Sequence, residues 1–288
     1  MTTAIIAGYG YCGYYLSRTL LKQNTSVLAL SRTLQPEFKL AHLQRIAFDI
    51  NEHSLPEEMP ESVLYYFVPP INKGKTDTVL QRFLALNKKP DFTRVVYCGS
   101  SGVYGNHQGK WVNEFSECRL ISERQYRRMD AEQQWQKFCA RHNIPLVILR
   151  VGGIYGPERL PIRQCTEQSP VLIPAEAPFI NHIFVNDLVD CLLEFGQNSV
   201  VTGVFNIADG QPLPMGQFQQ ILAECLKLPL AEEFDFKTIW EQASPMKREF
   251  MESNKRLCID KILQAVPSFR PTPIKAAIRQ ILKERDSL

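Results

Sequence analysis

The sequence predicts an α/β fold, with a doubly wound parallel sheet followed by a smaller C-terminal α+β lobe. Over the first half of the chain, short and continuously apolar runs alternate with segments of helical periodicity. Parallel strands that are buried on both faces and joined by helices produce this pattern. The first apolar run also ends in a glycine-rich turn that leads straight into a helical segment. Together these observations indicate an open sheet with helices on both faces.

The expected strands are short runs of β-branched, aliphatic or aromatic residues, bounded by polar or turn-forming residues. They lie at residues 3–7, 26–30, 45–48, 63–68, 94–97 and 145–150. Helices are expected where apolar residues recur every three to four positions. They lie at residues 16–22, 76–87 and 125–142. The strand–helix alternation therefore continues to about residue 150.

A different composition begins after residue 150, where prolines crowd into 157–178 and the predicted loops lengthen. We expect a short strand at 204–207 among helices at 186–195, 215–226 and 274–283. We therefore divide the chain into a first domain over residues 1–155 and a smaller lobe over 156–288. No linker-like segment separates the two, so the lobe is expected to be partly interleaved with the first domain.

Composition excludes several classes of protein. The chain has 288 residues, of which 44% are hydrophobic and 22% charged, so it is neither a disordered chain nor a small disulfide scaffold. The formal net charge is only +3, from 33 basic and 30 acidic residues. Such a small excess predicts no general affinity for nucleic acids or membranes.

The cysteines and histidines indicate no metal site. The eight cysteines form no CxxC pair, and no two of the five histidines have a metal-ligand spacing such as HxxxH. The N-terminal segment lacks the basic region of a signal peptide, and no later stretch is long and apolar enough to span a bilayer. We therefore expect a cytoplasmic protein with free thiols.

The most informative motif is the GxGxxG run Gly8-Tyr9-Gly10-Tyr11-Cys12-Gly13, which follows a predicted strand and opens a predicted helix. This is the context in which the motif binds a dinucleotide in Rossmann-type folds. The first glycine allows the tight turn, the second lets the backbone approach a pyrophosphate, and the third allows close helix–strand packing. The helix N-terminus then offers N–H groups to the phosphates. The alternative is a glycine-rich turn that binds no ligand.

The end of the second predicted strand bears on the choice of cofactor. An NAD site usually places Asp or Glu there to bind the ribose hydroxyls, but this chain has Ser31 and Arg32. A guanidinium and a hydroxyl can instead hold a 2′-phosphate, so we expect NADP, with NAD as the alternative. Asp49 is a candidate for an adenine contact, and Val68-Pro69-Pro70 would wall the pyrophosphate.

Four segments together carry a resemblance to a known family. They are the turn at 8–13, CGSSGVYG at 98–105, LRVGGIYGP at 149–157 and INHIFVND at 180–187. In this order the chain resembles the extended short-chain dehydrogenase/reductase superfamily, of the NAD-dependent epimerase/dehydratase type. Within that superfamily it is most similar to the atypical, YeeZ-like group. The resemblance covers nearly the whole chain and implies a Rossmann domain that carries a smaller substrate lobe.

The resemblance also implies an active site from which this chain departs. In the family, a serine at the fifth strand works with a tyrosine and a lysine four residues apart on the next helix. The tyrosine acts as acid or base, and the lysine lowers its pKa and holds the nicotinamide ribose. Ser100 matches the serine. Aligning the helix on its Ala-Glu ending, however, places Arg124 at the tyrosine position and Arg128 at the lysine position.

Two tyrosines are candidates to replace the acid that the family's tyrosine would supply. Tyr126 is two residues out of step with the tyrosine position, which is about 200° around a helix. Tyr104 lies in the VYG segment. The alternative is that Tyr104 packs near the cofactor and Tyr126 lies on another helix face. Arg128 could hold ribose or phosphate, but a guanidinium is a poor proton donor because its pKa exceeds about 12.

The remaining candidates come from the same resemblance. Gly153 would approach the nicotinamide, and the residues facing substrate would be Ser101, Glu114, Arg124 and His182. Glu114 and His182 could equally be loop residues. Arg124, Arg127 and Arg128 could form a solvated basic face, or Arg124 and Arg128 could bind an anion.

Two functions follow as hypotheses. The first is an NADP-dependent oxidoreductase or epimerase/dehydratase-like enzyme, acting on a small polar, sugar-like or anionic substrate. The second is a non-catalytic NADP(H)-binding sensor or structural protein that lost the catalytic pair. The exposed faces of helices 76–87 and 125–142 could pair two subunits into a homodimer.

Overall fold

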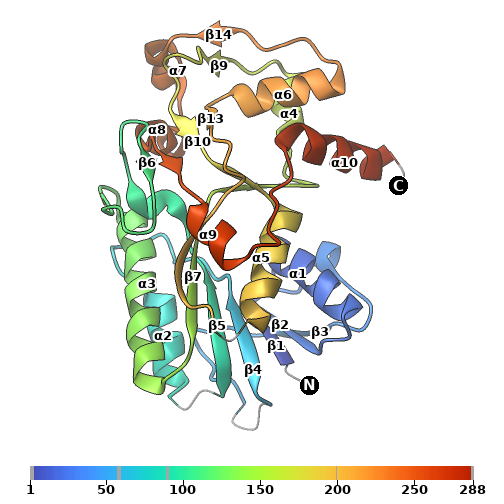
Figure 1. Ribbon diagram of the computed structural model, residues 1–288, viewed down its shortest axis with the longest axis vertical. Coiled ribbons are helices and arrows are strands. Elements are labelled where there is room, and N and C mark those ends of the chain that lie inside the picture. The colour runs from blue at the N-terminus through green and yellow to red at the C-terminus, as the bar shows by residue number, and fades with distance from the viewer. Residues whose placement is uncertain (1–2, 57–59, 89–90, 199, 287–288) are drawn as a thin grey trace. The chain divides into compact units, whose positions relative to one another are not determined.

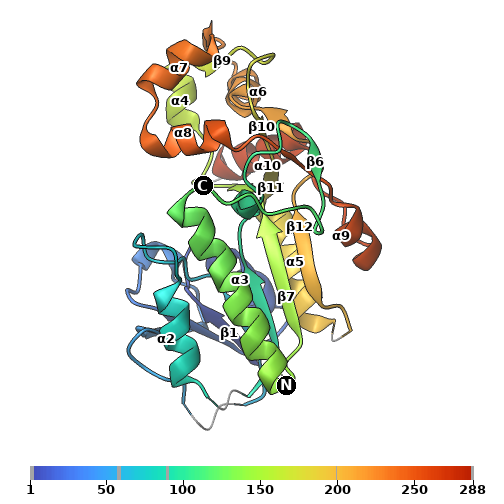
Figure 2. The same ribbon diagram turned by 90° about the vertical axis from the view of Figure 1, so that its left-hand side faces the viewer.

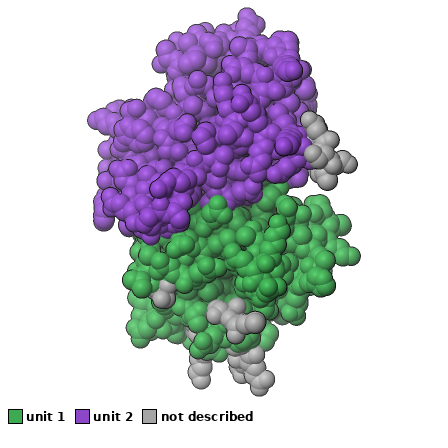
Figure 3. All heavy atoms as spheres, turned by 45° about the vertical axis from the view of Figure 1, so that its right-hand side comes forward, with its two compact units in different colours: residues 1–103, 120–150, 188–205 green, residues 104–119, 151–187, 206–288 purple. Residues whose placement is uncertain are grey.

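The structure, a computed structural model, describes residues 3–56, 60–88, 91–198 and 200–286. The chain divides into two compact units, which Figure 3 shows in different colours. Unit 1 comprises residues 1–103, 120–150 and 188–205, and unit 2 comprises residues 104–119, 151–187 and 206–288. Each unit is therefore assembled from three separate stretches of the chain.

A seven-stranded sheet organises unit 1, with the strand order β12-β7-β5-β4-β1-β2-β3 (Figure 1). The strands are β1 Thr3–Ala7, β2 Val27–Ser31, β3 Gln44–Ala47, β4 Ser62–Tyr66, β5 Phe92–Cys98, β7 Leu146–Val151 and β12 Gly203–Ile207. Every pairing from β3 across to β7 is parallel. The predicted doubly wound parallel sheet is confirmed.

Helices cover both faces of this sheet (Figure 2). They are α1 Tyr11–Lys22, α2 Thr78–Leu86, α3 Glu123–His142 and α5 Val185–Gln197. Tyr65 and Tyr66 are neighbours in β4, so their side chains point to opposite faces. The ring of Tyr66 packs edge-on against Trp135 of α3, with ring centroids 5.2 Å apart, whereas the Tyr65 hydroxyl lies against Gly196 of α5. Helices α3 and α5 therefore lie on opposite sides.

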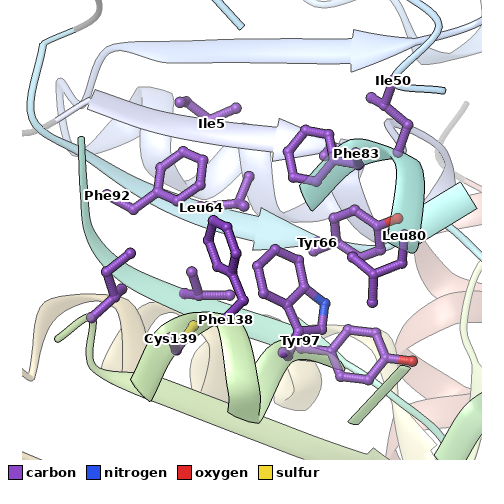
Figure 4. Packing of buried hydrophobic residues seen from close by; sticks show 14 of the residues in the cluster. Ile5, Ile50, Leu64, Tyr66, Leu80, Phe83, Phe92, Tyr97, Phe138 and Cys139 are labelled. Atoms are coloured by element: carbon purple, nitrogen blue, oxygen red, sulfur yellow. The ribbon is translucent and has the colours of Figure 1, made fainter. Parts of the chain in front are cut away.

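The core beneath α2 and α3 is largely aromatic (Figure 4). The ring of Tyr66 contacts those of Tyr97 in β5, Phe83 of α2 and Trp135 of α3, and all four side chains are fully buried. Edge-on and tilted contacts between such rings add to the free energy gained by burying their apolar surface. This packing fixes α2 and α3 on the sheet.

The helix ends follow from local sequence. Helix α3 starts at a capping box, in which Ser122 accepts a hydrogen bond from the backbone of Gln125 and the Gln125 side chain accepts one from Ser122. It ends at Asn143, whose φ of 53° suits asparagine. Helix α2 is capped by Asp77, which accepts from the Leu80 amide at 3.1 Å. Helix α1 differs, because no side chain caps it.

Unit 2 consists of short strand pairs and helices. The pairs are β6 Trp111–Val112 with β15 Arg256–Leu257, β8 Gly153–Tyr155 with β11 His182–Phe184, β9 Val171–Leu172 with β14 Glu233–Phe234, and β10 Phe179–Ile180 with β13 Leu213–Pro214. The helices are α4 Ile162–Thr166, α6 Gln217–Leu226, α7 Phe236–Gln242, α8 Pro245–Glu252, α9 Asp260–Ala265 and α10 Ile274–Asp286. Leu172, Ile239 and Met251 belong to a small core of this unit.

Two expectations about single elements need correction. The strand expected at 204–207 in the second lobe is β12, at the edge of the main sheet. Its apolar pattern specifies a strand but says nothing about which strand it joins. The helix expected at 16–22 already begins at Tyr11, because the glycine turn itself forms its first residues. None of the helices in the described part of the chain is both long and apolar enough to cross a membrane.

Candidate dinucleotide-binding site

The glycine turn joins β1 to α1 and leaves the start of α1 open. Gly8 has a φ of +84°, and a Cβ built there would lie 2.7 Å from the Val68 nitrogen, so the turn packs against the end of β4. Gly10 occupies the N-cap position, and a Cβ there would meet nothing within 4 Å. The first turn of α1 contains no acidic residue. An uncapped helix N-terminus beside open space fits an oxyanion such as a pyrophosphate.

Tyr9 holds the turn in shape. Its hydroxyl donates to the Phe38 carbonyl at 2.8 Å, and the Arg45 guanidinium lies 5.4 Å from the centre of its ring. Burial raises the pKa of Tyr9 to about 12 and outweighs the opposing effect of Arg45. Tyr9 therefore stays protonated and supports the backbone of the turn. Tyr11 is also buried and packs on Tyr15, with ring centroids 5.0 Å apart.

An exposed arginine, Arg32, follows the end of β2. Arg32 is exposed, and none of the described residues forms an ion pair or hydrogen bond with its guanidinium. The Ser31 hydroxyl donates to the Thr33 carbonyl at 2.9 Å, which fixes the bend that carries Arg32. Asp49, after β3, uses one carboxylate oxygen to accept from the Asn51 amide at 2.9 Å. Pro69 is exposed at the end of β4, and Val68 and Pro70 are half-buried.

Arg128 of α3 lies near Tyr97 and Cys98 at the carboxyl end of β5. Burial raises the pKa of the Cys98 thiol, with a smaller contribution from Cys12, and the Arg128 guanidinium opposes both. Arg128 likewise opposes the rise that burial causes in the pKa of Tyr97. These effects require Arg128 to be near the carboxyl end of β5, where Cys12 of the turn also lies.

The serine loop follows β5 directly. The Ser100 hydroxyl accepts a hydrogen bond from the Gly102 amide at 3.1 Å and is half-buried, whereas Ser101 is buried. Tyr126 of α3 carries the Lys75 ammonium 4.5 Å from its ring centre. The Lys75 ammonium therefore occupies one face of the Tyr126 ring.

The basic residues of α3 differ in their environments. Arg127 is only 3% exposed and donates to the Gly74 carbonyl at 2.5 Å and to the Asn72 side chain at 2.8 Å. The interpretation of 124–128 as a solvated basic face is therefore wrong for Arg127, which anchors the loop before α2. Arg124 and Arg128 are half-buried and lie one turn apart on the helix.

Tyr104 and Glu114 belong to unit 2, where both bind Asn206. The Tyr104 hydroxyl is fully buried and donates to the Asn206 Oδ1 at 2.6 Å. Glu114 accepts from the Asn206 backbone amide at 2.8 Å. A hydroxyl that is enclosed and donates its proton to an amide is poorly placed to protonate a substrate. This placement speaks against the catalytic role expected for Tyr104 and favours the packing alternative.

Gly153 and His182 face each other across the β8–β11 pair of unit 2. His182 stacks on Phe218, with ring centroids 4.9 Å apart, and burial lowers its pKa to about 4. The imidazole is therefore neutral at physiological pH. Asp209, which donates its backbone amide to the His182 carbonyl at 2.7 Å, was missed by the sequence analysis. Burial raises the pKa of this carboxyl to about 7, and no pattern in the sequence signals it.

Comparison with known proteins decides the family. Residues 4–208 match the model of the NAD dependent epimerase/dehydratase family, which is well over half of the chain. The chain belongs to this family. One relative of this chain is YtcB of Bacillus subtilis (strain 168), which is described as an uncharacterized UDP-glucose epimerase. It is 31% identical over 101 residues, which are 33% of this chain and 32% of YtcB, so the match spans about a third of that relative.

Two solved structures resemble this chain over nearly its whole length. A functionally unknown conserved protein from Silicibacter pomeroyi is 26% identical, with a TM-score of 0.80, over 99% of this chain and 100% of that chain. UDP-glucuronic acid 4-epimerase from Bacillus cereus, in complex with NAD, is 17% identical, with a TM-score of 0.76, over 99% of both chains. At that identity the second likeness shows the shared fold alone.

Helix α3, all of which the structure describes, has no tyrosine and lysine four positions apart. Tyr126 is the one tyrosine in α3, and Lys137 is its one lysine, eleven positions further along. Arg124 and Arg128 lie where the resemblance implies the tyrosine and the lysine. The two positions of α3 that the resemblance assigns to the tyrosine and the lysine therefore carry arginines, whose guanidinium groups are poor proton donors. In the described part of the chain, no three His, Cys, Asp or Glu side chains group in a way that could hold a metal ion.

Proposed function

We propose that unit 1 binds a nicotinamide dinucleotide at the turn formed by residues 8–13, with NADP(H) preferred over NAD(H). The observation that carries this proposal is the uncapped start of α1, where Gly10 leaves the space of its missing Cβ open. The pyrophosphate would accept hydrogen bonds from the N–H groups of this turn. When bound, the nicotinamide supplies the hydride chemistry, and the protein orients it.

Other residues of unit 1 would contact the two halves of the cofactor. Ser31 and Arg32 would bind a 2′-phosphate, Asp49 the adenine edge, and residues 68–70 would line the pyrophosphate. Arg128 would place its charge next to a phosphate or ribose, since Arg128 and Cys12 of the turn both act on the pKa of the Cys98 thiol. UDP-glucuronic acid 4-epimerase from Bacillus cereus is in complex with NAD, so the preference for NADP(H) in this chain rests on Arg32 and on the missing acid after β2.

Replacing Arg32 with alanine tests the cofactor preference. A hydrogen bond between two charged groups is worth about 1.5–3 kcal/mol, so we expect the affinity for NADPH to fall by about 10- to 150-fold. The affinity for NADH should change less than about twofold, because NADH has no 2′-phosphate. Isothermal titration calorimetry measures both, with the exposed Arg82→Ala of α2 as a matched control. Equal NADPH binding by wild type and Arg32→Ala would rule out the role of Arg32.

We also propose an oxidoreductase or epimerase/dehydratase-like reaction on a small polar, sugar-like or anionic substrate. The family and the UDP-sugars named for its relatives support a sugar-like substrate. The competing proposal is a non-catalytic cofactor sensor. It is favoured by Arg124 and Arg128 in place of a tyrosine and a lysine, and by the burial of Tyr104.

A turnover assay separates these two proposals. UDP-glucose and UDP-glucuronic acid are incubated with the cofactor-loaded protein, and nicotinamide absorbance and product sugars are followed. An enzyme should lose at least tenfold in turnover on Ser100→Ala with an unchanged cofactor affinity, because the lost hydroxyl lies outside the phosphate turn. Cofactor binding with no turnover of either sugar by the wild type would instead support the sensor.

A further inference from the structure

Lys255 of unit 2 is a buried ammonium, and none of the residues that the structure describes gives it an acidic partner. The residue is 5% exposed and lies just before β15. Its Nζ donates to the Ser253 hydroxyl at 2.7 Å. No carboxylate of the described residues lies within ion-pair distance of it. Buried charges in proteins are nearly always paired, so this one calls for an explanation.

The surroundings hold the Lys255 segment firmly in place. The Asn181 side chain donates to the Lys255 carbonyl at 3.0 Å and accepts from the Leu257 amide at 2.7 Å. The Ser253 hydroxyl, which receives the ammonium, donates in turn to the Gly105 carbonyl at 3.3 Å. Backbone and side chain of Lys255 are therefore both fixed before any ligand arrives. Such preorganisation reduces the entropy lost on binding.

The hydrogen-bonding capacity of the ammonium is only partly used. An ammonium has three N–H donors, and the described residues supply one acceptor, the Ser253 hydroxyl. Burial lowers the pKa of Lys255 to about 8, so most of it remains protonated at pH 7. A purely structural role would be met at lower cost by an apolar side chain of similar length. A ligand oxyanion would supply both the missing acceptors and the missing negative charge.

We propose that Lys255 is an anion-binding residue, whose ammonium receives a carboxylate or phosphate oxygen of a small-molecule ligand. The site rests on residues of unit 2 alone and does not depend on the nucleotide turn. If the anion is part of the substrate, the inference deepens the proposed function by assigning a residue to an anionic group. It does not require the 2′-phosphate or the pyrophosphate of the cofactor.

Nitrogen NMR of lysine side chains tests the site directly. The protein is labelled with ¹⁵N-lysine, and the Lys255 ammonium signal is assigned by its absence in Lys255→Met. Inorganic phosphate and glucuronate are titrated at pH 7, with sodium chloride at matched ionic strength as the reference. We expect a saturable shift of the Lys255 signal with at least one of the two probes and none with chloride. No saturable shift with either probe would overturn the proposal.

Variants of Lys255 test whether this side chain binds the anion. We expect Lys255→Met to weaken binding of the effective probe at least tenfold and Lys255→Arg to retain part of it. Lys275→Met is the matched control, since Lys275 forms an exposed ion pair with Glu224 in the same unit. Equal probe binding by Lys255→Met and wild type would overturn the proposal. If Lys255→Met does not fold, Lys255→Arg and the wild-type titration decide.

The result is separable from the test of the proposed function. NADPH binding should be the same in Lys255→Met and wild type, because the nucleotide turn belongs to unit 1. Loss of the anion response with NADPH binding retained supports the Lys255 site. An anion response in a protein that binds no dinucleotide would refute the proposed function and leave Lys255 as the anion site.

Discussion

Replacing Gly10 with valine is expected to abolish dinucleotide binding while leaving the stability of the fold nearly unchanged. A Cβ at Gly10 meets nothing within 4 Å, and its φ of −146° is negative, so we expect the protein to accommodate the side chain. The same side chain would occupy the space where a pyrophosphate approaches the start of α1. We expect at least a 100-fold loss of affinity, or about 2.7 kcal/mol, measured by calorimetry.

Gly8→Val is the matched control for this prediction. Gly8 has a φ of +84°, and its Cβ would lie 2.7 Å from the Val68 nitrogen, so the same substitution two residues earlier strains the fold itself. We expect it to lower the free energy of unfolding by about 1–3 kcal/mol. Thermal unfolding should therefore separate the two variants. Wild-type affinity in Gly10→Val would contradict the assignment of the phosphate turn.

Replacing Arg150 with methionine is expected to destabilise unit 1 more than any exposed substitution. Arg150 at the end of β7 makes three hydrogen bonds to Glu132 of α3, at 2.8, 3.1 and 3.2 Å, and both residues are buried. Burial raises the pKa of Glu132, and the bonds from Arg150 oppose that rise. Without Arg150 the carboxylate is left unpaired, which costs about 3–5 kcal/mol. Denaturant unfolding measures this loss.

Two further variants show whether pairing is the cause. Glu167→Ala removes the partner of Arg163 from an exposed ion pair and should lower the free energy of unfolding far less than Arg150→Met does. The double variant Glu132→Leu, Arg150→Met removes both buried charges and should recover most of the stability lost in Arg150→Met. If the double variant is as unstable as Arg150→Met alone, lost packing rather than an unpaired charge explains the effect.

The sheet could be predicted from sequence because each strand carries its own signal. Runs such as 3–7 and 145–150 are apolar apart from Thr3 and Arg150 at their ends, as expected for strands covered on both faces, and both form strands at almost those positions. The glycine turn could also be predicted from sequence, because the positive φ and the close packing of Gly8 require glycine.

The remaining features depend on long-range contacts that no local pattern records. The pattern of 204–207 predicts a strand, but its place beside β7 depends on how the chain returns to the sheet. Arg127 looks like its neighbours Arg124 and Arg128, and only the loop before α2 makes it a buried anchor. Lys255 is an ordinary lysine in sequence. Its burial depends on contacts of its segment with distant residues such as Asn181 and Gly105, and only the structure shows that none of the described residues gives it an acidic partner.

The central claim is that a nicotinamide dinucleotide binds at the start of α1. The most direct test is a backbone amide NMR titration of deuterated, ¹⁵N-labelled protein with NADPH and with NADH. We expect saturable shifts of the amides of residues 9–13 with at least one of the two cofactors, and larger shifts at Ser31 and Arg32 with NADPH. An absence of saturable shifts at residues 9–13 with either cofactor would contradict the account.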